Sequence, residues 1–334
     1  MTDLATRYLG LELRNPVVAS ASPLSNSADG VRRLADGGAG AVVLYSLFEE
    51  QLRQAAARDA AAAEAGTDSF AESLSYFPPA ASADGAPRHY LSLLERAAGA
   101  VDVPVIASLN GSTTGGWTDY ASALQNAGAA AIELNIYHLP GGPVVTGRDV
   151  EQRHIEILTT VKAVVSVPVA VKLSPYFSSI GEMALRLDRA GADGLVLFNR
   201  FLQPDIDPET LTVSAPFGLS SPAEGRLPRT WIALLAGRVR ASLGATTGVE
   251  DAAVVARYLL AGADVVMTTS SLLRHGPAHA RVLLDGLEGW MERKGFTSLS
   301  AVRGLLAKAP ESEPAYSRTG YLSAVEQASH AYAL

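Results

Sequence analysis

One pattern occurs four times in the chain: the end of a helix, a glycine turn and an apolar strand follow one another directly. The four copies are GGAGAVVLY (37–45), NAGAAAIELN (126–135), RAGADGLVLFN (189–199) and LAGADVVMTT (260–269). A glycine suits the left-handed residue that ends a helix. Continuous Val, Ile and Leu runs are typical of parallel strands covered on both faces. The pattern therefore predicts a parallel sheet wrapped in helices.

Four further segments complete a set of eight predicted strands. VDVPVIASLN (101–110) and VSVPVAVKLS (165–174) resemble each other, and NPVVASAS (15–22) and the weaker RVRASLGA (238–245) join them. Apolar residues at helical spacing separate these strands, at 27–36, 148–165, 179–190 and 250–261. Eight strand–helix units predict an α/β fold, the (β/α)₈ TIM barrel, over residues 1–305 as a single domain. A doubly wound open sheet is the alternative, but no G-x-G-x-x-G follows the first strand.

Two connections are longer than such a unit requires. Residues 48–88 contain the alanine-rich helical stretch AAARDAAAAEAG followed by SYFPPAASADGAP, and residues 200–229 have the Pro and Gly content of a loop. Both follow the C-terminal end of a strand, where barrel enzymes place lids and substrate contacts. Residues 306–334 form a predicted C-terminal tail that lies on the surface or serves in assembly.

Composition excludes several classes of protein. The net charge is −7, and no stretch is rich in Lys and Arg, so neither nucleic acid nor an anionic membrane is an expected partner. The N-terminus has no basic-then-apolar signal pattern and no apolar run is long enough to span a membrane, so we expect a cytoplasmic protein. With no cysteine, the chain has no disulfide, thiolate metal site or cysteine nucleophile. We expect no metal site.

Polar residues stand where the predicted strands end. They are Ser20, Ser22, Tyr45, Ser46, Asn110, Asn135, Lys172, Asn199, Thr268, Thr269 and Ser270. In a barrel these positions ring one mouth, where amides can pair with a flat heterocycle and an ammonium can stabilise a developing anion. Each Asn has the alternative of simply closing a turn. Lys172 lies between VPVAV and LSP, where a cation needs a partner or a task.

Two turns predict a phosphate site. GATTG (244–248) precedes a helix, and TTSS (268–271) ends the eighth strand. Barrels commonly hold a phosphate in the loops after strands seven and eight, with backbone N–H groups and hydroxyls. An ordinary turn at 244–248 is the alternative.

These strand ends, in this order, resemble the dihydroorotate dehydrogenase family of FMN-containing barrels. The similarity runs from RNPVVASAS to about Gly304 and is most specific at ELN (133–135), VKLSPYF (171–177), Asn199 and AGADVVMTTSSLLRHGP (261–277). The resemblance implies bound FMN, with Lys172 at the flavin N1–C2=O edge. It also implies a set of cofactor contacts at Ala21, Ser22, Tyr45, Asn110, Asn135, Asn199, Gly244, Ala245, Thr246, Thr269 and Ser270. Asn110, Asn135 and Asn199 would also contact the substrate.

The resemblance fails at the substrate side. Family members that oxidise dihydroorotate follow ELN with L-S-C-P-N or V-S-S-P-N, whose Cys or Ser removes a proton from substrate C5. This chain has Ile136-Tyr137-His138-Leu139-Pro140 there. His138 stands at the position of the base, with Tyr137 as the alternative, and an imidazole titrates near neutrality. The other interpretation is that both residues only pack the loop.

The sequence therefore predicts an FMN-dependent oxidoreductase that transfers a hydride between flavin N5 and a small planar substrate, dihydroorotate or a related dihydropyrimidine. Two alternatives stay open at this point. One is a Schiff-base lyase or aldolase with Lys172 as nucleophile, and the other is a flavin-binding relative without redox activity. The resemblance also implies a homodimer or assembly with an iron–sulfur subunit.

Overall fold

A closed parallel barrel is the centre of the molecule. The computed structural model describes residues 2–55, 57, 85–113, 117–138, 141, 144–201, 203–214, 218–307 and 318–331. Within these residues eight parallel strands follow each other around the barrel, and the pairing of β4 with β6 closes it. The barrel strands are β3 (Val17–Ala19), β4 (Ala41–Val43), β6 (Val105–Gly111), β7 (Ala131–Ile136), β8 (Val169–Leu173), β9 (Gly194–Leu197), β12 (Ser242–Ala245) and β13 (Val265–Thr268). Each coincides with one of the eight predicted segments, although β6 and β7 run one residue past the predicted ends at 110 and 135. The TIM barrel is therefore confirmed and the open sheet is excluded.

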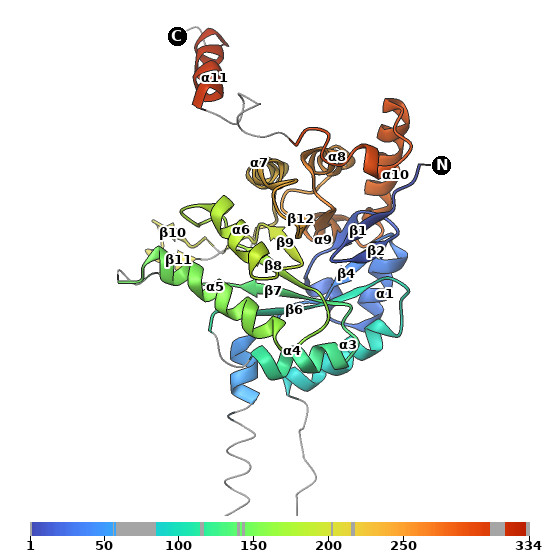
Figure 1. Ribbon diagram of the computed structural model, residues 1–334, viewed down its shortest axis with the longest axis vertical. Coiled ribbons are helices and arrows are strands. Elements are labelled where there is room, and N and C mark those ends of the chain that lie inside the picture. The colour runs from blue at the N-terminus through green and yellow to red at the C-terminus, as the bar shows by residue number, and fades with distance from the viewer. Residues whose placement is uncertain are drawn as a thin grey trace, which may run out of the picture.

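Helices surround the barrel on its outside (Figure 1). They are α1 (Ala28–Asp36), α3 (Ala86–Ala98), α4 (Trp117–Asn126), α5 (Gly147–Lys162), α6 (Ile180–Arg189), α7 (Arg226–Leu235), α8 (Ala252–Ala261), α9 (Ser270–His275) and α10 (His279–Lys294). The main hydrophobic core lies between these helices and the outward faces of the strands. The four helices predicted from apolar spacing appear as α1, α5, α6 and α8.

The four glycines of the repeated pattern have the predicted left-handed backbone. Their φ angles are +113° at Gly38, +93° at Gly128, +96° at Gly191 and +111° at Gly262. A side chain would be strained at such angles. The glycine lets the chain leave the helix and enter the next strand within a few residues, so this turn fixes the strand–helix period.

A small hairpin closes the N-terminal end of the barrel. Its strands β1 (Thr6–Tyr8) and β2 (Leu11–Leu13) are antiparallel. Tyr8, Leu9 and Leu13 are buried in a second hydrophobic cluster, together with inward-facing residues of the barrel strands such as Val18 and Met267. Burial of each such side chain contributes about 1.5–3 kcal/mol. The hairpin therefore plugs this end of the barrel.

The two long connections differ from each other. After β4 the chain forms β5 (Leu47–Phe48), a helical stretch at 49–55 and then α3; most of the predicted alanine-rich helix and SYFPP lie outside the described residues. The irregular loop predicted over 200–229 is wrong in part. That segment contains the β10 (Asp205–Asp207) and β11 (Thr212–Ser214) hairpin, the 3₁₀ helix η2 (Pro222–Gly225) and the first turn of α7.

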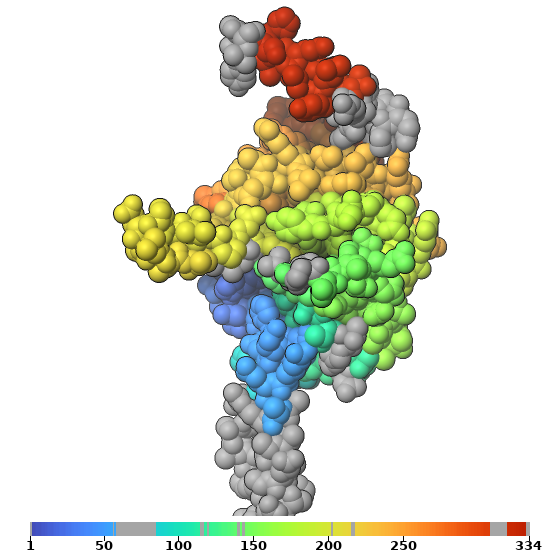
Figure 2. All heavy atoms as spheres, turned by 90° about the vertical axis from the view of Figure 1, so that its left-hand side faces the viewer, coloured from blue at the N-terminus to red at the C-terminus, as the bar shows by residue number. Residues whose placement is uncertain are grey.

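The hairpin was missed because its three-residue strands are too short to show alternation. Its turn is held by the Asp207 carboxylate, which accepts from the N–H groups of Glu209 and Thr210 at 2.9 and 3.2 Å. Figure 2 shows this yellow segment projecting from the body of the molecule.

Among the described residues, the last backbone hydrogen bonds to the barrel come just after the 3₁₀ helix η3 (Leu299–Ala301). The N–H groups of Gly304 and Leu306 donate to the carbonyls of Leu259 and Leu260, both at 2.9 Å. Helix α11 (Arg318–Ala331) is exposed from Tyr321 to Ala331 and stands apart from the barrel in Figure 1. In the part of the chain that the structure describes, no helix has the length and apolarity needed to cross a membrane.

Candidate active site

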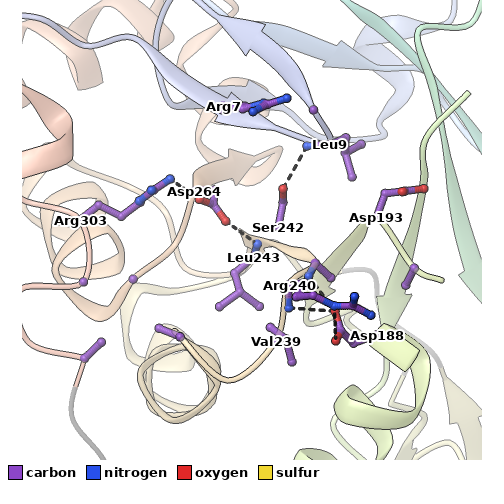
Figure 3. Close-up of a pocket in the computed structure, with 18 of the residues that line it drawn as sticks. Arg7, Leu9, Asp188, Asp193, Val239, Arg240, Ser242, Leu243, Asp264 and Arg303 are labelled. Carbon is purple, nitrogen blue, oxygen red and sulfur yellow. Dashed lines mark hydrogen bonds and ion pairs between the residues drawn. The ribbon is translucent and has the colours of Figure 1, made fainter. Parts of the chain in front are cut away.

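Two large cavities lie at opposite ends of the barrel. The cavity at the plugged end has a volume of about 930 Å³ and is drawn in Figure 3. The cavity at the C-terminal ends of the strands has a volume of about 760 Å³. The larger volume does not by itself identify the site, because barrel enzymes carry their chemistry at the C-terminal ends.

In the cavity at the plugged end, carboxylate groups anchor the starts of strands. The Asp188 carboxylate accepts from the N–H groups of Arg240 and Ala241 at 2.9 and 2.8 Å. The Asp264 carboxylate accepts from Leu243 N–H at 2.7 Å and pairs with Arg303 (Figure 3). Each of these carboxylates already has partners within the protein, so we interpret this cavity as structural.

Because side chains alternate along a strand, the predicted polar residues face the cavity at the C-terminal ends of the strands. Asn110, Asn135 and Lys172 are register partners on the neighbouring strands β6, β7 and β8. All three line the cavity, since a barrel strand points every second residue inward. The residues that precede them in their strands, such as Leu134 and Val171, belong to the main hydrophobic core between the strands and the helices.

Lys172 is the cation at the floor of this cavity. Its side chain is 9% exposed, and Nζ donates to Ser20 Oγ at 3.3 Å. Nζ also lies 3.4 Å from Glu133 Oε1, and the Glu133 side chain is 1% exposed. The lysine thus has the charge partner that its burial requires.

Amide groups lie beside this ammonium. Asn199, two residues after the end of β9, donates from Nδ2 to Asn135 Oδ1 at 2.8 Å. This bond holds the two amides side by side and leaves further donors and acceptors on both. Together with Asn110, they form a polar wall suited to the edge of a flat heterocycle.

The opposite side of the cavity is rich in hydroxyl groups and tight turns. Thr246, Thr247 and Gly248 line it after β12, with positive φ angles of +82° at Thr247 and +71° at Gly248. Ser220 Oγ accepts from Gly248 N–H at 3.1 Å and contacts Ser270 Oγ at 3.0 Å. Three separate segments therefore meet at Ser220, which joins the turns after β12 and β13.

The structure places most of the predicted cofactor residues in this cavity. Those that line it are Ala21, Asn110, Asn135, Lys172, Asn199, Thr246, Thr269 and Ser270. Thr269 Oγ1 lies 3.3 Å from Ser20 O and 3.4 Å from Ala21 O, so the ends of β3 and β13 are tied together.

The other four predicted cofactor residues lie outside the lining. Ser22 accepts from Leu24 N–H and caps the 3₁₀ helix η1 (Pro23–Ser25). The Tyr45 ring packs on the edge of Tyr90, with the ring centroids 5.1 Å apart. Ala245 faces the outer core.

Gly244, the fourth of these residues, faces the barrel interior. A Cβ there would lie 3.1 Å from Met267 Cε and 3.3 Å from Tyr8 Oη. The turn that reaches the cavity is therefore 246–248 and not 244–245.

Tyr137 and His138 take different positions at the end of β7. Tyr137 lines the cavity and stacks on Phe201, with the ring centroids 4.1 Å apart. His138 is not among the lining residues, and its ring nitrogens lie 3.3 Å from Arg153 on α5. Burial and the Arg153 charge lower the pKa of His138 below its ordinary value. The proton-transfer role of either residue stays a prediction.

Several residues of the site were missed in the sequence. Phe201, Gln203 and Ser220 line the cavity from the segment between β9 and α7. Ser220 meets Gly248 and Ser270 across 28 and 50 residues of chain, so no local motif marks it. Glu133 was visible as a carboxylate inside an apolar strand, which is itself a signal for a buried charge pair.

These features define a class of protein: a TIM barrel with its polar site at the carboxyl ends of the strands, as in barrel enzymes. A family model for dihydroorotate dehydrogenase matches residues 62–291, and the chain belongs to this family. It is accordingly a dihydroorotate dehydrogenase-like oxidoreductase that acts on a CH–CH bond.

Curated relatives agree with this assignment. The chain is 29% identical to the catalytic subunit of dihydroorotate dehydrogenase B (NAD(+)) of Methanothermobacter thermautotrophicus, over 90% of this chain and 98% of the relative. Catalytic subunits of the same name from Halalkalibacterium halodurans and Shouchella clausii are 32% and 31% identical, each over 61% of this chain and 68% of the relative.

Proposed function

We propose that the chain binds FMN at the mouth of the barrel and transfers a hydride between flavin N5 and a small planar substrate. Dihydroorotate or a related dihydropyrimidine is the expected substrate class. The observation that carries the proposal is the pairing, in one cavity, of an ammonium and amide wall with a hydroxyl-rich turn.

The donor set fits a flavin mononucleotide. Lys172, Asn135 and Asn199 offer a cation and amides on one side, which suits the polar edge of a flavin ring. Ser220, Ser270 and the turn at 246–248 offer hydroxyls and backbone N–H groups on the other side, which suits a phosphate. The first set comes from the ends of barrel strands and the second from the turns after β12 and β13 together with Ser220, so the barrel would orient the cofactor.

Bound FMN would supply the hydride chemistry. The protein would supply binding, charge and proton transfer. The Lys172 ammonium would offset negative charge on the ring, because it is held in place by Ser20 and Glu133. When a CH–CH bond is oxidised, a proton leaves together with the hydride, and Tyr137 or His138 would accept it. Tyr137 and Phe201 would cover the substrate and exclude water.

The visible absorbance of the purified protein tests the proposal first. A flavin spectrum, and bleaching of that spectrum on anaerobic addition of dihydroorotate or dihydrouracil, are the expected results. A colourless protein that takes up no added FMN would contradict the flavin site. A yellow protein that no dihydropyrimidine bleaches would contradict the substrate class.

Ser220 offers a matched test of the phosphate side. Ser220→Asp places a carboxylate against the phosphate. Ser220→Asn is the matched control, because the Asn side chain has nearly the size of Asp but carries no charge. We expect the Asp variant to purify with at least about tenfold weaker FMN binding than the Asn variant, which is 1.4 kcal/mol. Equal flavin content in the two variants would mean that the phosphate lies elsewhere.

The role of Lys172 separates hydride transfer from lyase chemistry. Lys172→Met should slow flavin reduction, and borohydride should trap no substrate on the parent protein. A borohydride-stable adduct on Lys172 would identify the residue as a nucleophile.

A further inference from the structure

The Glu133 carboxylate is buried in the barrel below the cavity floor and is only half satisfied. Its Oε1 lies 3.4 Å from Lys172 Nζ, and its side chain is 1% exposed. Its Oε2 has no hydrogen-bond partner among the described residues. A buried carboxylate oxygen without a donor is unfavourable, so Oε2 marks a place where a donor belongs.

A second unsatisfied polar atom approaches from the plugged end of the barrel. Tyr8 is 1% exposed, and its hydroxyl has no partner within the described part of the chain. The phenol reaches deep into the barrel, since its oxygen would lie 3.3 Å from a Cβ built on Gly244 of β12. Burial raises the pKa of Tyr8 most, and the charges of Glu133 and Asp264 raise it further. Tyr8 is therefore a neutral hydroxyl that feels the charge of Glu133.

A single water molecule between the two atoms would satisfy both. A buried water typically makes about three hydrogen bonds to polar groups that otherwise lack partners. Between Tyr8 and Glu133 it would donate to Oε2 and accept from the phenol, which would make a chain from the hairpin plug to the cavity floor. Ser108, the register partner of Glu133 on β6, already contacts Ser46 Oγ at 2.9 Å, and Val18, Val196 and Met267 are apolar.

We propose that a buried water joins Tyr8 Oη to Glu133 Oε2, and that Glu133 is the positioning residue that holds Lys172 at the cavity floor. Glu133 touches neither substrate nor cofactor in this arrangement and acts through Lys172. The importance of this position for catalysis rests on the proposed flavin function, but the buried chain itself does not.

Two substitutions at position 133 separate charge from packing. Glu133→Gln preserves shape and removes the charge, whereas Glu133→Asp preserves the charge and shortens the side chain. If the charge of Glu133 holds Lys172, the NMR signal of Lys172 in the Asp variant resembles that of the parent more closely than the signal in the Gln variant does. If only packing matters, the Gln variant does, and the proposal is wrong.

Lysine NMR gives a direct measurement of this effect without any flavin signal. The chain has only four lysines, at 162, 172, 294 and 308, so ¹³C labelling of lysine gives a spectrum in which Lys172→Met identifies the Lys172 signal. In Glu133→Gln this signal should move to the neutral-amine position at a lower pH than in the parent. Signals of the other three lysines serve as the internal control.

Other titrating groups that interact with Glu133 have to be controlled. Among the described residues these include Tyr8 and Tyr90, whose pKa values are raised first by burial and further by the Glu133 charge; Asp264 acts on Tyr8. Tyr90 exchanges hydrogen bonds with the backbone of Ser108 and is already satisfied. Tyr8→Phe should shift the Lys172 signal in the same direction as Glu133→Gln, but by less.

A high-resolution crystal structure tests the water. It should show an ordered water within hydrogen-bond distance of both Tyr8 Oη and Glu133 Oε2, and this water should be lost or displaced in Tyr8→Phe. Direct contact between the two side chains, or no density between them, would overturn the proposal. This test stands even where Glu133→Gln fails to fold. A protein that binds no flavin yet shows the water and the lysine shift would contradict the proposed function and leave this inference standing.

Discussion

At the scale of single residues, the end of β7 carries the two candidates for proton transfer, Tyr137 and His138. Tyr137 lines the cavity and stacks on Phe201, whereas the His138 ring lies against Arg153. The sequence alone pointed to His138, because it stands at the position of the family's base. Alternation and loop geometry, which a motif does not contain, bring Tyr137 to the cavity instead.

We therefore predict that Tyr137→Phe slows substrate-driven flavin reduction by about 10²–10⁴-fold, the usual contribution of a positioned acid–base group. His138→Ala should retain most of the rate, and both variants should stay yellow because the phosphate contacts are elsewhere. Stopped-flow reduction under anaerobic conditions measures this. The reverse pattern would support His138, as the sequence predicted.

The pH profile gives an independent test of His138. Burial and Arg153 lower the pKa of this imidazole, so it stays unprotonated at neutral pH. If His138 were the base, activity would fall at acid pH as the ring takes up a proton. Arg153→Gln would then raise the pKa and move that acid limb to higher pH. We predict that the limb does not move in Arg153→Gln.

At the scale of elements, the sequence was most informative where a turn and a strand meet. Gly38, Gly128, Gly191 and Gly262 predicted the strand–helix period, because a left-handed residue at a helix end leaves a clear signal. The β10–β11 hairpin left none, because its strands are short and its turn depends on Asp207. Strand ends gave the amides and Lys172, but Ser220 entered the site only through contacts with distant segments.

Helix α5 should make the fold sensitive to mild acid. His154 on its inner face is 2% exposed, contacts Val150 O at 2.8 Å and packs on the Phe177 ring, with the centroids 5.1 Å apart. Burial lowers the pKa of His154 to about 4. In the unfolded chain a histidine titrates near 6.5, so between pH 6.5 and 4 the unfolded state binds more protons. The contribution of His154 to the free energy of unfolding is therefore fully present above pH 6.5, and it is lost as the pH decreases through this window.

Because the pKa of His154 is about 4 in the folded chain and near 6.5 in the unfolded chain, the expected loss of stability between pH 7 and pH 4 is about 3 kcal/mol. Urea unfolding at a series of pH values measures it. His154→Leu should flatten the dependence, whereas His330→Gln on the exposed helix α11 should leave it unchanged. An equally steep loss in His154→Leu would assign the acid sensitivity to other groups.

At the scale of the whole molecule, the barrel is closed at one end and chemically equipped at the other. The β1–β2 hairpin plugs the N-terminal end, and carboxylates such as Asp188 and Asp264 anchor strand starts there. The strand ends at the opposite face carry the ammonium, amides and hydroxyls. The groups that stabilise the fold and the groups suited to chemistry thus lie at opposite ends of the barrel. For that reason, carboxylates in one cavity are paired within the protein, whereas the other cavity presents an ammonium, amides and hydroxyls.

Backbone hydrogen bonds indicate where the barrel domain ends near the C-terminus. In the part of the chain that the structure describes, the last backbone bonds to the barrel come from Gly304 and Leu306, whereas α11 is exposed from Tyr321 to Ala331. We predict that a chain ending at Ala307 keeps the melting temperature and flavin content of the full chain. A chain ending at Val302 loses both bonds, at about 0.5–1.5 kcal/mol each, and should melt at a lower temperature. Size-exclusion chromatography of the same pair shows whether the tail serves assembly: a smaller particle after truncation at Ala307 would assign it to a subunit interface. If truncation at Ala307 instead lowers the melting temperature of a monomer, residues 308–334 are part of the barrel domain and the boundary near residue 305 is wrong.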